Sequence, residues 1–180
     1  MKIKSIEKII KASKKLAVKK SPDGTTWLGD GKSMYNVGDM ATSDPLKTIK
    51  WLFGIEDDIA DYNVDLFRYQ PPRDDDLGDG VPEGKIRFPA IGYKGITIVP
   101  YLFSDVVFFL TEEQLAPLLN EENVTYFYHT QTRRILAFRG IFVVASFEAF
   151  TLPADSEVVD SLEKLLLLVT SKGEERVSVR

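Results

Sequence analysis

A Gly-Lys-Ser triplet at Gly31-Lys32-Ser33 is the first stretch with the residue types for chemistry, because this triplet ends the phosphate-binding loop of many nucleotide enzymes. That loop also needs a glycine five residues before Gly31, where this chain has Thr26, and a helix directly after the triplet. The residues that follow are interrupted at Gly38. We therefore predict a β-hairpin turn at Gly29-Asp30-Gly31 and no nucleotide at Gly31-Lys32-Ser33.

An acidic loop from Asp74 to Gly80 offers the oxygen ligands that calcium and magnesium prefer. In the best register for a calcium loop, however, Leu77 falls on a ligand position and Ile86 falls where a glutamate is required. We predict no metal site and no cofactor. A carboxylate- or metal-dependent hydrolase stays open as an alternative, and it would need two or more of these residues to converge: Asp57, Asp58, Asp61, Asp74, Asp75, Asp76 and Asp79.

The chain has a single histidine, His129, and no cysteine, so the usual nitrogen and sulfur ligands of zinc are missing within one chain. Histidine is the side chain whose ordinary pKa suits general base catalysis near neutrality. His129 follows a predicted strand beside a turn, and the chain has no Gly-x-Ser-x-Gly nucleophile motif. We expect a surface histidine and, for the whole chain, no catalytic residue.

Basic residues are concentrated at the start of the chain. Residues 1–20 contain eight lysines and one glutamate, a net charge of +7, whereas the remaining residues carry −11. Such asymmetry indicates a polyanionic partner, although a lysine-rich helix also serves simply as a solvated face. If the partner is nucleic acid, the residues predicted to bind its phosphates are Lys4, Lys8, Lys11, Lys15, Arg133 and Arg134.

Two groups of aromatic and apolar residues are further candidates for binding. Aromatic and basic groups are interleaved at Tyr126, Tyr128, His129, Arg133 and Arg134, a pattern that suits single-stranded nucleic acid but also cross-strand pairs on an exposed sheet face. The apolar residues Trp51, Leu52 and Phe53 are the predicted contact surface for a protein partner or for self-association.

Composition indicates a globular domain. The chain has 180 residues, of which 44% are hydrophobic and 28% charged, close to the averages for globular proteins. Apolar runs such as Leu165–Val169 are far shorter than the roughly 20 residues that cross a bilayer. The start of the chain, MKIKSIEKIIKASKK, lacks the unbroken apolar run of a signal peptide, so we expect a cytoplasmic protein with no membrane partner.

Apolar periodicity and turn residues predict the elements that would position these residues. An amphipathic helix precedes Ser21, a second helix begins after Asp44, a capping box at Thr111–Gln114 opens a third, and a fourth runs from Asp155 or Ser156 to near Gly173. Residues 56–70 are left unassigned. Strands are predicted at 25–28, 32–37, 85–88, 96–99, 105–110, 124–129, 134–138 and 141–150.

These elements predict an α+β fold in which helix-plus-hairpin units and an antiparallel meander sheet pack against three or four helices. Residues 1–180 form a single compact unit in this interpretation, with two lobes as an alternative: a helix-hairpin-helix lobe at 1–70 and a lobe at 84–180 with the antiparallel sheet and the C-terminal helix. The acidic loop, rich in proline and glycine, at 71–83 would separate the lobes.

The stretch WLGDGKSMYNV, preceded by the basic segment Ser5–Leu16, resembles small uncharacterised proteins of prophages and mobile elements of Gram-positive bacteria. This resemblance covers roughly the first forty residues and implies an accessory protein without an assigned activity. The layout of lysine-rich helices backed by hairpins is also similar to DNA sliding clamps, which implies helices that face a duplex.

From these observations we predict a non-catalytic accessory protein that binds a macromolecule. A protein partner or self-association is the first expectation, and nucleic acid is a further one. The two alternatives are a clamp-like protein that contacts DNA phosphates through its basic first helix, and the carboxylate- or metal-dependent hydrolase described above.

Overall fold

The computed structural model describes residues 1–21, 23–40, 44–55, 86–87, 89–103, 106–152, 157–162 and 164. Packing contacts divide the chain into two units, Met1–Ala149 and Phe150–Arg180, and each is described by itself. In the second unit, residues 157–162 and 164 are helical, as predicted. The predicted start of that helix at Asp155 or Ser156 and its end near Gly173 lie outside the described residues.

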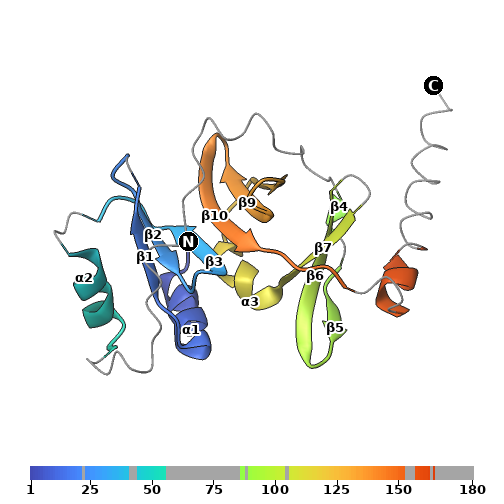
Figure 1. Cartoon of the computed structure of the whole chain (residues 1–180), viewed down its shortest axis with the longest axis horizontal. Helices are drawn as coiled ribbons and strands as arrows, with labels where there is room; N and C mark the ends of the chain where they lie inside the picture. Colours follow the sequence, from blue (N-terminus) through green and yellow to red (C-terminus); the bar gives the residue numbers. More distant parts are fainter. Residues whose placement is uncertain are drawn as a thin grey trace. The chain divides into compact units, whose positions relative to one another are not determined.

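The first unit is built on a six-stranded antiparallel sheet, and the chain has the predicted α+β character. The order of the strands is β1-β2-β3-β10-β9-β8, and all of them except β8 are labelled in Figure 1. The central pair is β3 with β10, so strands from residues 1–70 and from residues 84–180 share one sheet. The strand bounds are β1 Ala17–Lys20, β2 Thr26–Gly29, β3 Ser33–Asn36, β8 Val124–His129, β9 Arg134–Arg139 and β10 Phe142–Glu148.

This sheet confirms the predicted hairpin at Gly29–Gly31 and the predicted meander. Trp27 pairs with Asn36 and Gly29 with Met34 across the β2–β3 turn, in which Gly31 has a φ of 87°. Such a positive φ is the conformation that glycine adopts without strain. The last three strands, β8, β9 and β10, pair consecutively and antiparallel.

A second antiparallel sheet is centred on β6 (Ile96–Phe103). The strand β7 (Val106–Thr111) runs along one edge of β6, and β4 (Ile86–Arg87) and β5 (Ile91–Tyr93) pair with two successive stretches of the other edge. The strand β5 lies outside the predicted strands. Lys94 and Gly95, both with positive φ, form the tight turn from β5 into β6.

The first helix, α1 (Ile3–Ser13), is shorter than predicted. The prediction that it runs on towards Ser21 is wrong, because Lys14 adopts a left-handed φ of 53° and the chain then enters β1. Leu16, Ala17 and Val18 are buried after the end of the helix, and Ala17 and Val18 lie in β1. Lys15 therefore lies beyond the helix that was expected to carry it.

The other helices follow their predicted caps. Helix α2 (Pro45–Leu52) begins after Asp44, whose carboxylate accepts a hydrogen bond from the backbone amide of Lys47 at 3.0 Å. Helix α3 (Glu112–Leu115) has the predicted capping box between Thr111 and Gln114, and a short 3-10 helix, η3 (Ala116–Leu118), continues it. Among the described residues, no helix has the length and apolar content to cross a membrane.

Register places the apolar side chains in rows that cross the whole six-stranded sheet, since directly paired residues project from the same face. One face joins the main core, where Ile6 and Ile10 of α1 pack; its row is Val18, Leu28, Tyr35, Ala145, Ala137 and Tyr126. The opposite face carries a second cluster: Ala17, Trp27, Met34, Leu136, Phe138 and Val143.

Candidate functional site

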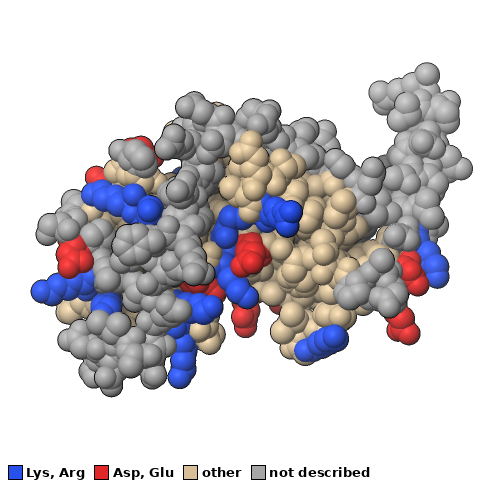
Figure 2. Space-filling view, in the orientation of Figure 1, with Lys and Arg blue, Asp and Glu red and all other residues tan. Residues whose placement is uncertain are grey.

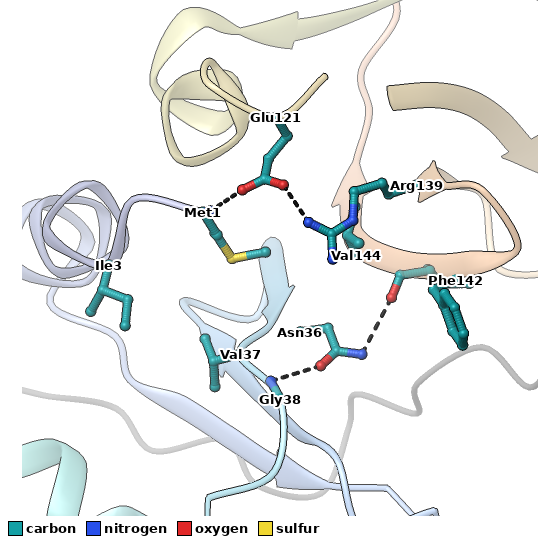
Figure 3. A pocket seen from close by; sticks show the side chains of 10 residues that line it. Met1, Ile3, Asn36, Val37, Gly38, Glu121, Arg139, Phe142 and Val144 are labelled. Atoms are coloured by element: carbon teal, nitrogen blue, oxygen red, sulfur yellow. Dashed lines mark hydrogen bonds and ion pairs between the residues drawn. The ribbon is translucent and has the colours of Figure 1, made fainter. Parts of the chain in front are cut away.

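The described part of the first unit contains a hollow of about 450 Å³ beside the end of the β9–β10 hairpin (Figure 3). Four segments meet there: the start of α1, the end of β3, the residue Glu121 after η3, and the hairpin itself. Its lining consists of Met1, Ile3, Asn36, Val37, Gly38, Glu121, Arg139, Phe142, Val143 and Val144.

The hollow lies where the pairing of β3 with β10 ends, next to a β-bulge in β10. The two strands pair from Ser33 to Tyr35, and the β9–β10 register then shifts between Val143 and Ala145. An extra residue in one strand bends it and interrupts the hydrogen-bond ladder. The Asn36 side chain spans the gap, since its Nδ2 donates to the Val143 carbonyl at 3.3 Å and its Oδ1 accepts from the Gly38 amide at 3.0 Å.

A carboxylate with two cationic partners lies at the upper side of the hollow in Figure 3. Glu121 accepts from the Arg139 guanidinium at 2.7 Å and also from the amino group of Met1. The Glu121 side chain is only 12% exposed, whereas that of Arg139 is 59% exposed. Glu121 is held in place by backbone bonds, from its own amide to the Leu118 carbonyl and from Lys2 to the Pro117 carbonyl, both at 2.9 Å.

Two residues that line the hollow, Ile3 and Phe142, have large exposed apolar side chains. Phe142 is 66% exposed and Ile141, next to it in the hairpin turn, is 78% exposed. Ile3 is also exposed and lies on the opposite side of the hollow from Phe142 (Figure 3). The backbone register pairs Phe142 with Arg139 across the hairpin, and both residues line the hollow; in Figure 3 the guanidinium points towards Glu121.

The lysines predicted to bind phosphates are all exposed. Lys4, Lys8 and Lys11 share one face of α1 by their spacing, and Lys15 follows the helix. Lys11 forms an ion pair with Glu7 at 2.7 Å. On the face drawn in Figure 2, basic and acidic side chains are interspersed rather than gathered into one field.

The two predicted arginines have different surroundings. Arg133 is exposed in the β8–β9 turn with a φ of 54°. The Arg134 guanidinium instead donates to atoms of β10 and of the β2–β3 turn: Ser146 Oγ at 2.7 Å, the Ser146 carbonyl at 3.1 Å, the Lys32 carbonyl at 2.7 Å and the Gly31 carbonyl at 3.2 Å. These hydrogen bonds thus link the β9–β10 hairpin to the β2–β3 hairpin.

The three apolar residues predicted to contact a partner, at the end of α2, differ in burial. Trp51 is 79% exposed and Leu52 is also exposed, whereas Phe53 belongs to the main core. The seven aspartates named for a hydrolase all lie outside the described residues. Within the described ranges, no group of three or more His, Asp or Glu side chains is arranged to hold a metal ion.

The aromatic and histidine candidates of β8 lie within the fold. Tyr126 packs against Tyr101 with ring centroids 4.9 Å apart, and Tyr128 stacks on Phe108 at 4.2 Å, so these rings join the two sheets. The expectation that His129 is a surface residue is wrong, because the β8–β9 turn folds Thr132 over it. Its Nδ1 accepts from the Thr132 amide at 3.3 Å and lies 2.7 Å from the Thr132 hydroxyl.

The Gly31-Lys32-Ser33 segment is part of the hairpin rather than a helix start. Ser33 is buried in β3, and its hydroxyl accepts from Gln114 Nε2 at 3.1 Å. Burial raises the pKa of the Asp30 carboxyl above its ordinary value, even though the Ser33 amide donates to it at 2.7 Å. The turn thus contains a carboxylate whose ionised form is poorly solvated.

This shift predicts a pH-dependent effect of Asp30→Asn. A folded-state pKa above the unfolded value means that ionised Asp30 opposes folding above that pKa, and the penalty disappears once the pH falls below the unfolded value. We expect the variant to be more stable than the wild type at pH 7, with a difference that shrinks towards about pH 4. Urea denaturation across this range measures it, with Asp23→Asn, an exposed turn aspartate, as the control.

The sequence did not indicate Glu121, Asn36 or Phe142 as site residues. The available signal was Arg139-Gly140-Ile141-Phe142, a turn in which two large apolar residues directly follow the glycine. No protein-family model, curated protein or solved structure matches this chain.

Proposed function

We propose that this chain is a non-catalytic binding domain that takes a short segment of a protein partner into the hollow beside the β9–β10 hairpin. The observation that carries the proposal is the exposure of Phe142, which lines a concave site, together with the exposure of Ile141 beside it in the hairpin turn. Large apolar side chains grouped on a surface are typical of protein interaction sites.

The size and lining of the hollow favour an extended segment with one or two inserted side chains. A volume of about 450 Å³ lies in the range of small ligand sites. Val37, Val144 and Phe142 supply apolar walls, and Arg139 supplies charge that gives a ligand its orientation. Aromatic and arginine side chains are also the residue types that contribute most to binding energy at interfaces.

A selection of random peptides displayed on phage against the immobilised full chain tests the proposal. We expect selected peptides to bind the wild type with micromolar affinity and to bind Phe142→Ser at least about tenfold more weakly, which corresponds to about 1.4 kcal/mol. Fluorescence anisotropy of labelled peptides measures both affinities.

Trp51→Ser is the matched control, because Trp51 is at least as exposed as Phe142 but lies on α2. Its affinity should equal that of the wild type. If the selected peptides lose affinity in Trp51→Ser and retain it in Phe142→Ser, the binding surface is instead the predicted patch of Trp51 and Leu52. Equal binding by both variants contradicts the hollow as the site.

The lysine face of α1 supports a second candidate, binding of nucleic acid. Lys4 and Lys8 are exposed one turn apart, with Lys11 on the same face. If these three side chains neutralise three phosphates, log K for duplex DNA should fall with log[salt] with a slope of about −3. A labelled duplex titrated at two salt concentrations tests this, and no binding at the lower concentration eliminates it.

A further inference from the structure

We infer that the partner segment carries an acidic side chain directly beside its apolar one, and that Arg139 binds the carboxylate. This inference rests on the proposed function and adds the chemistry of the ligand. Arg139 and Phe142 are cross-strand partners, and both line the hollow. Side chains in such a pair start from Cβ atoms roughly 4.5–5.5 Å apart, a distance that neighbouring groups of one ligand span.

Arg139 retains hydrogen-bonding capacity for a ligand. A guanidinium has five N–H donors in a planar fork. Among the described residues, its one hydrogen-bond partner is Glu121, which takes a single bond from Nη1. More than half of the Arg139 side chain is exposed, so the remaining donors are accessible from the solvent side of the hollow. A carboxylate matches this fork in charge and in shape.

Glu121 competes with the ligand for Arg139 without satisfying it. Its second oxygen accepts from the amino group of Met1, so the negative charge of Glu121 is shared between two donors. Glu121 therefore has two effects: it orients the guanidinium over the hollow, and it weakens the attraction of Arg139 for an incoming carboxylate. Removal of the Glu121 charge should therefore lower the stability of the fold and raise the affinity for a carboxylate ligand.

The probes are two blocked, labelled hexapeptides, acetyl-Ala-Ala-Leu-Asp-Ala-Ala-amide and the same peptide with Asn in place of Asp. Fluorescence anisotropy with the full chain should give about tenfold tighter binding of the Asp peptide. Arg139→Gln should remove this difference. Arg133→Gln, which removes an exposed arginine from the other turn, should leave it unchanged.

Glu121→Gln separates a ligand-binding role of Arg139 from a merely structural one. We expect this variant to bind the Asp peptide more tightly, by about threefold, while its melting temperature falls, because a partly buried ion pair is lost but Arg139 is released. A structural role alone would lower the melting temperature and either lower the affinity or leave it unchanged.

Three results overturn the inference: equal binding of the Asp and Asn peptides, binding of neither, or an Asp preference that persists in Arg139→Gln. A further peptide lacks Asp and ends in an apolar residue with a free carboxylate. If it binds more tightly than the Asp peptide, the carboxylate that Arg139 binds is a chain terminus and not an acidic side chain. In each case, the selected peptides and Phe142→Ser still decide the proposed function separately.

Discussion

Gly29→Ala is expected to lower the free energy of unfolding by about 3 kcal/mol, one of the two largest effects predicted for this chain. A Cβ added at Gly29 would lie 1.8 Å from the Ser33 carbonyl oxygen and 2.8 Å from its carbon. The Ser33 carbonyl cannot move away easily, because the Asp30 amide donates to it at 3.1 Å within the turn. Relief therefore requires the hairpin to open.

Urea denaturation followed by the fluorescence of buried Trp27 measures this effect. Gly92→Ala is the control, since Gly92 also lies in a strand and an added Cβ there meets no atom within 4 Å. We expect a change below about 0.5 kcal/mol for the control. Similar stability of the two variants would contradict the close approach of Gly29 and Ser33.

Arg134→Gln is expected to lower the free energy of unfolding by about 2 kcal/mol. Its guanidinium donates to three backbone carbonyls and to the Ser146 hydroxyl, and Ser146 is fully buried. Hydrogen bonds from a charged donor are stronger than neutral ones, and the variant removes this donor from the buried Ser146 hydroxyl.

Arg133→Gln removes the same charge from the neighbouring position and serves as the control for Arg134→Gln. Arg133 is exposed, so we expect its unfolding free energy to stay within about 0.5 kcal/mol of the wild type. Both arginines are predicted to bind phosphates, but only Arg134→Gln is expected to lower the free energy of unfolding. A comparison of the two variants therefore separates an effect on stability from an effect on nucleic-acid binding. Equal stability of the two variants would show that Arg134 does not hold the hairpins together.

Local signals in the sequence were sufficient for much of the fold. Asp44 and the Thr111–Gln114 pair carry capping chemistry that acts over three residues, and both helices begin where these caps predict. The Gly29–Gly31 turn and the meander from Val124 onward depend equally on short-range patterns. These features succeeded because the interactions that determine them lie close together in the sequence.

The errors arose where tertiary contacts override local patterns. Leu16 and Ala17 continue the helical spacing of Ile6 and Ile10, but burial of residues 16–18 around the edge strand β1 outweighs helix propensity after Lys14. His129 is buried because a turn folds over it, and its position at a strand end gave no sign of this.

The site could not be predicted because distant segments compose it. Glu121 and Arg139 are 18 residues apart, and Asn36 reaches Val143 across more than a hundred residues. The β-bulge beside the hollow has no glycine or proline at Val143–Ala145 that would indicate it in the sequence. Only the pairing of β3 with β10, the most distant pairing in the sheet, brings these residues together.

Amide chemical shifts of the ¹⁵N-labelled full chain, recorded during titration with a selected peptide, test the central claim most directly. Binding in the hollow predicts shifts concentrated at Asn36–Gly38, Glu121 and Arg139–Val144. Shifts concentrated instead at Trp51–Phe53, or along Lys4, Lys8 and Lys11, would contradict the hollow as the site where this protein binds its partner.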